Sequence, residues 1–301
     1  KPALIFWWER LAPWPAMMAC CRRPVAWLDS GLCEAGHFML ILYHGANSVC
    51  SIKVRIVLAE KALDWEGRHI DLPKGEQFHA DFLKVSPRAI VPVLDHDGVL
   101  IHESSVISEY LDGLSAHNRL MPPDATAKAR TRIWGLNTLE YHDSVNTLTF
   151  SSYQRQMLLA KSPEELQARW DAMPDKIRVR KTLDLMEHGA KSDYVPVALS
   201  RLQRMCAEME ESLASHDWLM GPDYGLADAL LTAYFFRIDC IGLAPLWESR
   251  FRRVTDWYAR IRERPSLAAA TAPWLDAAAI DRIRQVGRKT FIEDADFPDY
   301  L

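Results

Sequence analysis

Residues 86–105 read SPRAIVPVLDHDGVLIHESS, and this stretch decides the fold. Two short apolar runs, Val91–Asp95 and Val99–His102, flank three turn-forming residues, a pattern that predicts a β-hairpin. Pro92 lies at the entrance of the first strand, where a missing N–H is costly unless the strand is at an edge or the Val91–Pro92 bond is cis. A cis bond would leave the N–H and C=O of Val91 free to pair with an extended, peptide-like ligand. The sequence leaves both alternatives open.

The residues before and after this hairpin show alternating strand-like and helical patterns. The strand-like runs are Leu40–Tyr43 and Trp65–Leu72, and the helical ones are Ile52–Leu63 and Gln77–Val85. A helix at Glu103–Leu114 closes the unit. The order β-α-β-α-β-β-α predicts a small α/β layer, with parallel strands first and an antiparallel hairpin at the end.

Downstream of a linker at Met121–Asp124 the pattern is helical throughout. The expected helical segments are Lys128–Ala160, Pro163–Trp170, Val195–Ser215, Ala227–Cys240 and Phe251–Glu263. We therefore predict an α/β domain at residues 39–120 and an all-α domain at residues 124–286.

Both ends of the chain differ from these two domains. Residues 1–38 hold four of the 11 tryptophans and show no helical or strand period. We expect them to be a leader or upstream segment, with the folded unit starting at Met39 and with Met17 and Met18 as alternative starts. Residues 287–301 are expected to form a solvated acidic tail.

The composition argues against several classes of protein. The formal net charge is −4, and basic residues form no stripe, so we expect no nucleic-acid partner. The longest apolar run, at residues 227–236, is far shorter than the ~20 residues that span a bilayer, so we expect no membrane segment. Six scattered cysteines predict neither a disulfide framework nor a metal site, and they favour a reducing compartment, the cytoplasm.

Two further places carry residues suited to chemistry. The first is the loop at residues 45–51, GANSVCS, between the first strand and the first helix. Ligands bind at strand ends in such sheets, and a helix N-terminus stabilises a thiolate or another anion. Ser48 and Asn47 are also common helix caps, so position alone explains them equally well as structural residues. The second is Glu103-Ser104-Ser105, whose carboxylate and hydroxyls match the ammonium and carboxylate of an amino-acid head group.

These motifs, in this order and followed by a helical domain, resemble the glutathione transferase superfamily from about Leu40 to about Ala270. Residues 224–229 resemble the buried helix-capping motif of that family, except that Gly225 replaces the usual Ser or Thr, so Asp228 would lack its reciprocal hydroxyl. The resemblance implies a thioredoxin-like N-terminal domain that binds glutathione, an all-α C-terminal domain and a homodimer.

The resemblance also implies roles for individual residues. Ser48 would donate a hydrogen bond to the glutathione sulfur, and Asn47 would help to position the thiolate or the substrate. Each unit by which the thiol pKa falls below ~8.5 gives up to tenfold more thiolate at neutral pH. The implied contacts of the γ-glutamyl head are Glu103 and Ser104. The cysteinyl backbone would pair with Val91-Pro92, and the glycyl carboxylate would lie near Gln77.

Within the superfamily, four parts of the chain look most like bacterial β-etherases, which cleave lignin-type aryl ethers. They are the loop at residues 45–48, the stretches 86–92 and 97–112, and a helical insert at about 162–193. Residues 48–55 are also similar to maleylacetoacetate isomerases and to hydroquinone dehalogenases, in which a cysteine at the place of Cys50 takes part in thiol exchange. A binding protein that stores or escorts a hydrophobic ligand is the non-catalytic alternative. If Ser48 is not the activating group, Asn47 or Ser51 would take its place.

The aromatic substrate is expected between the two domains. The rings available there are those of Tyr43, His44, Trp134, Tyr141, Phe150 and Tyr153. Rings at helical spacing are more often part of a core than of a pocket, so no single one of them is favoured.

Overall fold

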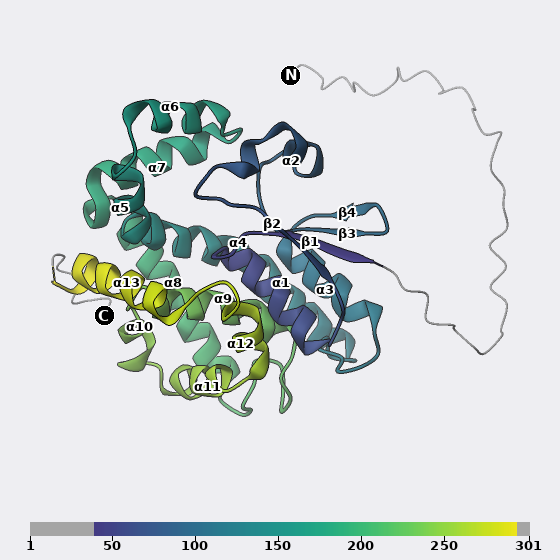
Figure 1. Ribbon diagram of the computed structural model, residues 1–301. Helices are drawn as coiled ribbons and strands as arrows, with labels where there is room; N and C mark the ends of the chain where they lie inside the picture. Colours follow the sequence, from purple (N-terminus) through teal and green to yellow (C-terminus); the bar gives the residue numbers. More distant parts are fainter. Residues whose placement is uncertain (1–38, 294–301) are drawn as a thin grey trace, which may run out of the picture. The chain divides into compact units, whose positions relative to one another are not determined.

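The computed structural model describes residues 39–293, so the predictions for residues 1–38 and 294–301 lie outside the described residues (Figure 1). Four strands form one mixed sheet in the order β2-β1-β3-β4. They are β1 (Leu40–His44), β2 (Glu66–His69), β3 (Val93–His96) and β4 (Val99–Ile101). Strand β1 runs parallel to β2 and antiparallel to β3, and β3 and β4 form the hairpin. The predicted α/β layer is confirmed.

Helices cover both faces of this sheet. Figure 1 shows α1 (Val49–Glu60) and α3 (Ser104–Leu114) on one face and α2 (Ala80–Val85) on the other. A 3-10 turn, η1 (Glu76–Phe78), precedes α2. Helix α1 begins three residues before the expected Ile52, because Ser48 caps it.

The remainder of the described chain is helical, as predicted. Its helices are α4 (Ala125–Phe150), α5 (Tyr153–Leu159), α6 (Pro163–Ala172), α7 (Lys176–His188), α8 (Tyr194–Ser212), α9 (Leu226–Cys240), α10 (Pro245–Glu248), α11 (Arg252–Arg262), α12 (Pro265–Thr271) and α13 (Ala277–Arg288), with a short turn η2 (Gly189–Lys191). Helix α7 lies within the helical insert expected at about 162–193, whereas α10, α12 and α13 were not predicted.

One expected helix, Lys128–Ala160, is divided into α4 and α5. The break lies at Ser151 and Ser152, whose hydroxyls donate to the carbonyls of Thr147 (2.8 Å) and Leu148 (2.6 Å) one turn earlier. Serine side chains that bond to the backbone in this way compete with the helix and bend it.

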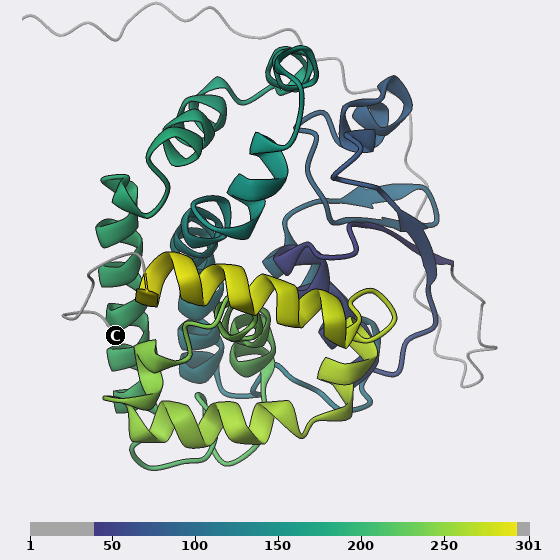
Figure 2. The ribbon, with the colours of Figure 1, turned by 60° about the vertical axis from the view of Figure 1, so that its left-hand side comes forward.

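The C-terminal part of the described chain crosses the bundle, as Figure 2 shows for α13 in yellow. Gly287 lies against the backbone of Ile241, where a Cβ would be 2.0 Å from the carbonyl oxygen. A π-helical turn, η3 (Lys289–Glu293), follows and buries Phe291. Residues 287–293, expected to be solvated tail, are therefore packed helix.

A buried ion pair anchors the connection between the two parts of the chain. Lys61 Nζ lies 3.0 Å from Asp112 Oδ1 and donates to the carbonyls of Ser115, His117 and Asn118. The carboxylate of Asp112 in turn accepts from the backbone N–H groups of Leu120 and Met121. Each charge thus has hydrogen-bonding partners in addition to the other, as buried charges require.

The capping motif before α9 keeps its carboxylate half despite its glycine. The carboxylate of Asp228 accepts from Gly225 N–H (3.0 Å), Leu219 N–H (3.0 Å) and Trp257 Nε1–H (2.8 Å). The Asp228 carboxylate thus has three donors, whereas Gly225 has no side chain to accept from the Asp228 N–H. A Cβ on Gly225 would lie 3.1 Å from the carbonyl oxygen of Leu120, which explains why a glycine fits there.

Candidate active site

The loop between β1 and α1 is held from two sides by buried arginines. Arg55 on α1 donates to the carbonyls of Gly45 (3.2 Å) and Ala46 (2.9 Å), and its Nε donates to Ala270 on α12 (2.8 Å). Arg237 on α9 donates to the carbonyl of Asn47 (2.7 Å). Three consecutive carbonyls are thereby fixed, so the loop and the N-terminus of α1 have one defined position.

The Asn47 side chain is part of the same hydrogen-bond network. Its amide oxygen accepts from Arg237, and its amide nitrogen donates to the Tyr153 hydroxyl (3.1 Å). The Tyr153 hydroxyl also accepts from Arg237 (2.6 Å). The structure thus ties Asn47 to α5 and α9.

Ser48 and Ser51 occupy different environments. The Ser48 side chain accepts from the Ser51 N–H (3.3 Å) as the cap of α1, and it remains partly exposed. Among the described residues its O–H donates to no acceptor, so that proton is free for a ligand. Ser51 is fully buried and accepts from the Gly45 N–H (3.2 Å). Of the two hydroxyls, Ser48 is therefore the one that can meet a ligand.

Cys50 is the second residue of the same helix and faces the helical part of the chain. Its Sγ is 3.5 Å from Nδ1 of His142 on α4. Burial raises the pKa of the Cys50 thiol, but His142, Lys53 and a hydrogen bond with Ser104 outweigh it, and the pKa is about 6. A partly exposed thiol with such a pKa is mostly ionised at neutral pH, which is typical of reactive cysteines.

Lys53 is a buried cation beside this thiol. Its Nζ donates to the hydroxyls of Ser104 (3.2 Å), Ser105 (3.2 Å) and Thr138 (3.4 Å). No carboxylate among the described residues lies within ion-pair distance of it. Burial lowers the pKa of Lys53 to about 8, although the charges of Cys50 and Glu103 act to raise it.

The Val91–Pro92 bond is cis, so the cis alternative holds and not that of an edge-strand proline in trans. Within the described residues, no hydrogen bond engages the backbone N–H or C=O of Val91. Glu103 stands at the start of α3, half-exposed, with its carboxylate 2.6 Å from Arg88. The Ser104 hydroxyl accepts from Lys53 and is nearly buried. The strand edge is thus open to a ligand, whereas Ser104 already has an internal partner.

Gln77 lies in η1 and is buried. Its Nε2 is 3.5 Å from the Leu72 carbonyl, and its Oε1 has no hydrogen-bond partner. Helix α6 reaches the same segment, since Arg169 donates to the Leu72 carbonyl (3.4 Å) and lies over the ring of Phe78. The insert expected at about 162–193 therefore contacts the sheet domain next to Gln77.

Sequence comparison places these features in a known family. A model of the glutathione S-transferase N-terminal domain matches residues 47–114, and one of the C-terminal domain matches residues 169–265. Protein LigF of Sphingobium sp. (strain NBRC 103272 / SYK-6) is 30% identical over 196 residues, which is 63% of this chain and 75% of LigF. The chain belongs to the glutathione S-transferase family.

Two further comparisons show relatives of this chain within the family. The crystal structure of the β-etherase LigF superposes with a TM-score of 0.69 at 26% identity, covering 78% of this chain and 99% of LigF. The tetrachloro-p-hydroquinone reductive dehalogenase of Sphingobium chlorophenolicum is 24% identical over 245 residues, 76% of this chain and 94% of the dehalogenase. The glutathione S-transferase fold expected from the sequence is confirmed.

Most of the rings expected near an aromatic substrate belong to the core of the transferase. His44, Trp134, Tyr141 and Tyr153 are buried, and Tyr141 donates to Glu208 on α8. Tyr43 and Phe150 are partly exposed. The four buried rings thus pack the protein, as rings at helical spacing usually do.

Four residues of the site escaped the sequence analysis: Lys53, Arg55, His142 and Arg237. A signal existed for three of them, because Lys53, Arg55 and Arg237 are cations inside largely apolar helices, and a buried cation must have hydrogen-bonding partners. No comparable signal marked His142.

Within the described residues, no group of three or more His, Cys, Asp or Glu side chains could hold a metal ion. None of the described helices has the length and apolar character of a membrane span.

Proposed function

We propose that this glutathione S-transferase directs a glutathione thiolate, activated at Ser48, to an aromatic electrophile, and that its reaction is the cleavage of a β-aryl ether. The observation that carries this proposal is the similarity to LigF, in sequence over three quarters of its length and in structure over nearly all of it. A free Ser48 hydroxyl at the N-terminus of α1 supports it, since both features stabilise a thiolate.

The proposed position of glutathione follows from the backbone of Val91. Its free N–H and C=O suit the cysteinyl unit of the tripeptide, which would lie antiparallel along this edge. Glu103 would meet the γ-glutamyl ammonium, with Ser104 and its neighbouring N–H groups near the carboxylate, and Gln77 would lie near the glycyl carboxylate. Asn47 would act by fixing the loop.

The proposed step is a displacement at the carbon that bears the aryl ether. The glutathione sulfur forms a bond to this carbon, the carbon–oxygen bond breaks, and its electron pair leaves with the phenolate. Phenols have a pKa of ~10, so the leaving group needs little help from an acid. Activation of the thiol is then the main task of the protein.

A second candidate function is thiol exchange at Cys50 in a reductive dehalogenation. The contact between Cys50 and His142 and the low pKa of the thiol favour it, together with the similarity to the dehalogenase. In the net reaction a carbon–chlorine bond is replaced by a carbon–hydrogen bond, two glutathione thiols are oxidised to the disulfide, and chloride is released. For both candidate reactions we propose that the protein acts in the reducing cytoplasm.

We also propose that the transferase is a homodimer. Apolar side chains stand exposed on α3 and α4, and they are Val106, Ile133, Leu136 and Leu139. Arg132 on α4 forms an ion pair with Glu109 on α3, to whose Oε1 its Nε and Nη2 both donate, and a hollow along α3 includes Val106, Tyr110 and Leu114. Exposed apolar side chains gathered on two neighbouring helices are typical of a protein–protein interface.

The deciding experiment incubates the purified protein with glutathione and one of three substrates, a β-aryl ether ketone, a chlorinated hydroquinone or maleylacetoacetate, and identifies the products by mass spectrometry. Phenol together with a glutathione thioether would support the first proposal. Chloride with glutathione disulfide would support the second, and isomerisation without consumption of glutathione would replace both. Glutathione binding without any turnover would favour a carrier of hydrophobic ligands.

A further inference from the structure

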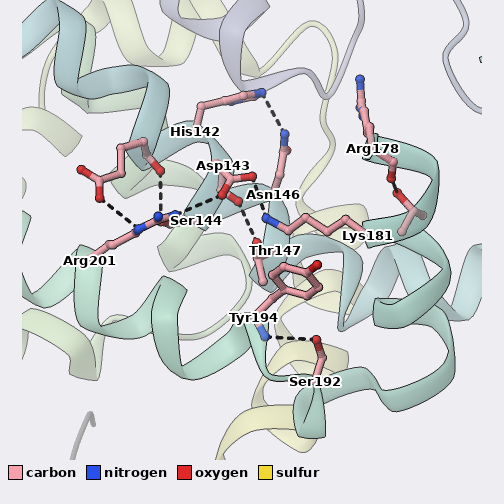
Figure 3. Close-up of polar contacts among 12 residues, drawn as sticks. His142, Asp143, Ser144, Asn146, Thr147, Arg178, Lys181, Ser192, Tyr194 and Arg201 are labelled. Carbon is pink, nitrogen blue, oxygen red and sulfur yellow. Dashed lines mark hydrogen bonds and ion pairs between the residues drawn. The ribbon is translucent and has the colours of Figure 1, made fainter. Parts of the chain in front are cut away.

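His142 on α4 has the surroundings of a residue that controls a neighbouring nucleophile. Its Nδ1 faces the Cys50 sulfur at 3.5 Å, and its Nε2 lies 2.8 Å from the side-chain amide nitrogen of Asn146, one turn further along α4. Figure 3 shows this second contact, with His142 and Asn146 joined by a dashed line. As placed, the amide donates to Nε2, which leaves the proton of a neutral ring on Nδ1, the nitrogen that faces the sulfur. Nucleophile, imidazole and orienting amide thus form a chain.

A buried cation, Lys53, also acts on the sulfur by its charge. Among the described residues, Lys53 Nζ has hydrogen bonds to hydroxyls alone, those of Ser104, Ser105 and Thr138, and it lies 5.0 Å from the ring centroid of Tyr234. A buried ammonium without a carboxylate needs another anion to offset its loss of hydration. The charges of Cys50 and Glu103 both act on Lys53, that of Cys50 more strongly, so a thiolate at Cys50 is the main anion that the described residues offer at this point.

Further charged and titratable groups face Cys50 from the neighbouring helices. Tyr234 on α9 approaches the thiol, and its hydroxyl donates to the Thr138 carbonyl (3.1 Å). Arg178 on α7 interacts with Cys50 by its charge, and no side-chain hydrogen bond or ion pair of Arg178 occurs among the described residues. Glu103 is the opposing anion, and it acts on Lys53 while paired with Arg88. Lys53 on α1, His142 on α4 and Arg178 on α7 thus interact with Cys50 from three helices.

We propose that His142, oriented by Asn146, is the positioning residue that keeps Cys50 a thiolate at neutral pH, and that Lys53 is the buried cation that balances it. The proposal rests on the same site as the proposed function, but it does not depend on which reaction the site catalyses. Because Cys50 lies on α1 and His142 on α4, the reactivity of the thiol is set across the boundary between the sheet domain and the helical domain.

The test measures the ionisation of Cys50 in the full-length protein. The protein is alkylated with iodoacetamide over a range of pH, and the peptide that contains Cys50 is quantified by mass spectrometry. Cys206 and Cys240 serve as internal references, because burial raises the pKa of both thiols. In the wild type the rate of Cys50 alkylation should rise with a midpoint at about pH 6.

His142→Gln should move this midpoint toward the ordinary value of ~8.5, so that alkylation below neutral pH becomes at least about tenfold slower. The same substitution at His188, an exposed histidine on α7, is the matched control and should leave the midpoint in place. An unchanged midpoint in His142→Gln would overturn the proposal.

Asn146 supplies a second, independent pair of variants. Asn146→Leu removes the partner of Nε2 and should raise the midpoint. Asn146→Asp replaces the amide donor by an acceptor, which can orient a protonated ring through its Nε2–H, and should keep the midpoint at the wild-type value or below. A residue that served packing alone would not distinguish these two variants, and equal midpoints would contradict the inference. If His142→Gln does not fold, as judged by circular dichroism, the Asn146 pair decides. An enzyme without ether cleavage whose Cys50 midpoint still depends on His142 would refute the proposed function and leave this inference intact.

Discussion

The guanidinium of Arg237 donates to the backbone carbonyl of Asn47 at 2.7 Å, although the two residues are 190 positions apart in the sequence. The same guanidinium donates to the Asn47 side chain and to Tyr153. One residue of the helical domain thus fixes the loop that ends at Ser48.

Replacing this residue should weaken both the fold and the site. Arg237→Met leaves the Asn47 carbonyl and the Tyr153 hydroxyl without their charged donor, and hydrogen bonds to charged groups contribute about 1.5–3 kcal/mol each. We expect a loss of about 3 kcal/mol or more in the free energy of unfolding, measured by urea denaturation, and a fall in kcat/KM. Arg250→Met, at an exposed position, is the control and should stay within about 0.5 kcal/mol of the wild type. A loss of less than about 1 kcal/mol in Arg237→Met would show that the loop does not depend on this arginine.

Ser48 should have a structural and a chemical effect that can be separated. Ser48→Ala removes the cap of α1 at a cost of about 1 kcal/mol and also removes the O–H donor, so turnover should fall about tenfold or more. Ser48→Asp restores a cap without a donor, so it should recover the melting temperature but not the rate. The measurements are thermal unfolding and the pKa of bound glutathione, followed by thiolate absorbance. Wild-type turnover in Ser48→Ala would assign the activation to another residue of the loop.

His44 should make the protein less stable in acid. Burial, Arg55 and His69 lower the pKa of His44 from 6.5 to about 4. The unfolded chain therefore binds a proton at higher pH than the folded one. His44 leaves the free energy of unfolding unchanged above pH 6.5 and lowers it as the pH falls from 6.5 toward about 4. Between about pH 7 and about pH 4.5 this loss amounts to about 2–3 kcal/mol.

The comparison variant for this loss is His44→Asn, which keeps an acceptor for Arg55 but cannot take up the proton. Urea denaturation of both proteins at the two pH values should show a smaller loss in the variant. Equal losses would mean that other groups, and not His44, dominate the acid sensitivity.

Leu136 should be part of the dimer interface. Leu136→Glu places a charge in the exposed apolar patch of α3 and α4, where it would be buried without a partner in a dimer. We expect size-exclusion chromatography with light scattering to give a dimer for the wild type and a monomer for the variant. Ile177→Glu, at an equally exposed leucine-sized residue on α7, should remain dimeric. A dimeric Leu136→Glu would place the interface on another surface.

The parts of the structure that the sequence predicted correctly depend on local signals. The turn between β3 and β4, the capping serine before α1 and the run of apolar residues in α9 are each encoded within a few neighbouring residues. The Val91–Pro92 bond was one of two open alternatives, because the isomer depends on the strand that accepts the proline.

The remainder depends on contacts between distant segments. Cys50 and His142 are 92 positions apart, and neither residue carries a local pattern that identifies its partner. Ser151 and Ser152 divide a periodic helical stretch through bonds to their own backbone, which periodicity does not reveal. Helix α12 has one turn-start signal, Pro265, and is too short for a recognisable period.

The cations of α1 have a consequence for how the molecule can be divided. Lys53 donates to Thr138 and Arg55 donates to Ala270, both of which belong to the helical domain. The loop before the helix is bound by Arg237, which also belongs to the helical domain. If the sheet domain were expressed alone, Lys53 and Arg55 would lose these hydrogen-bond partners. The apolar face of α1 that packs on α9 and α12 would also be exposed to water. The two domains should therefore unfold in one cooperative transition, and chimeras that exchange one domain for that of a relative will need the partners of α1 transferred with it.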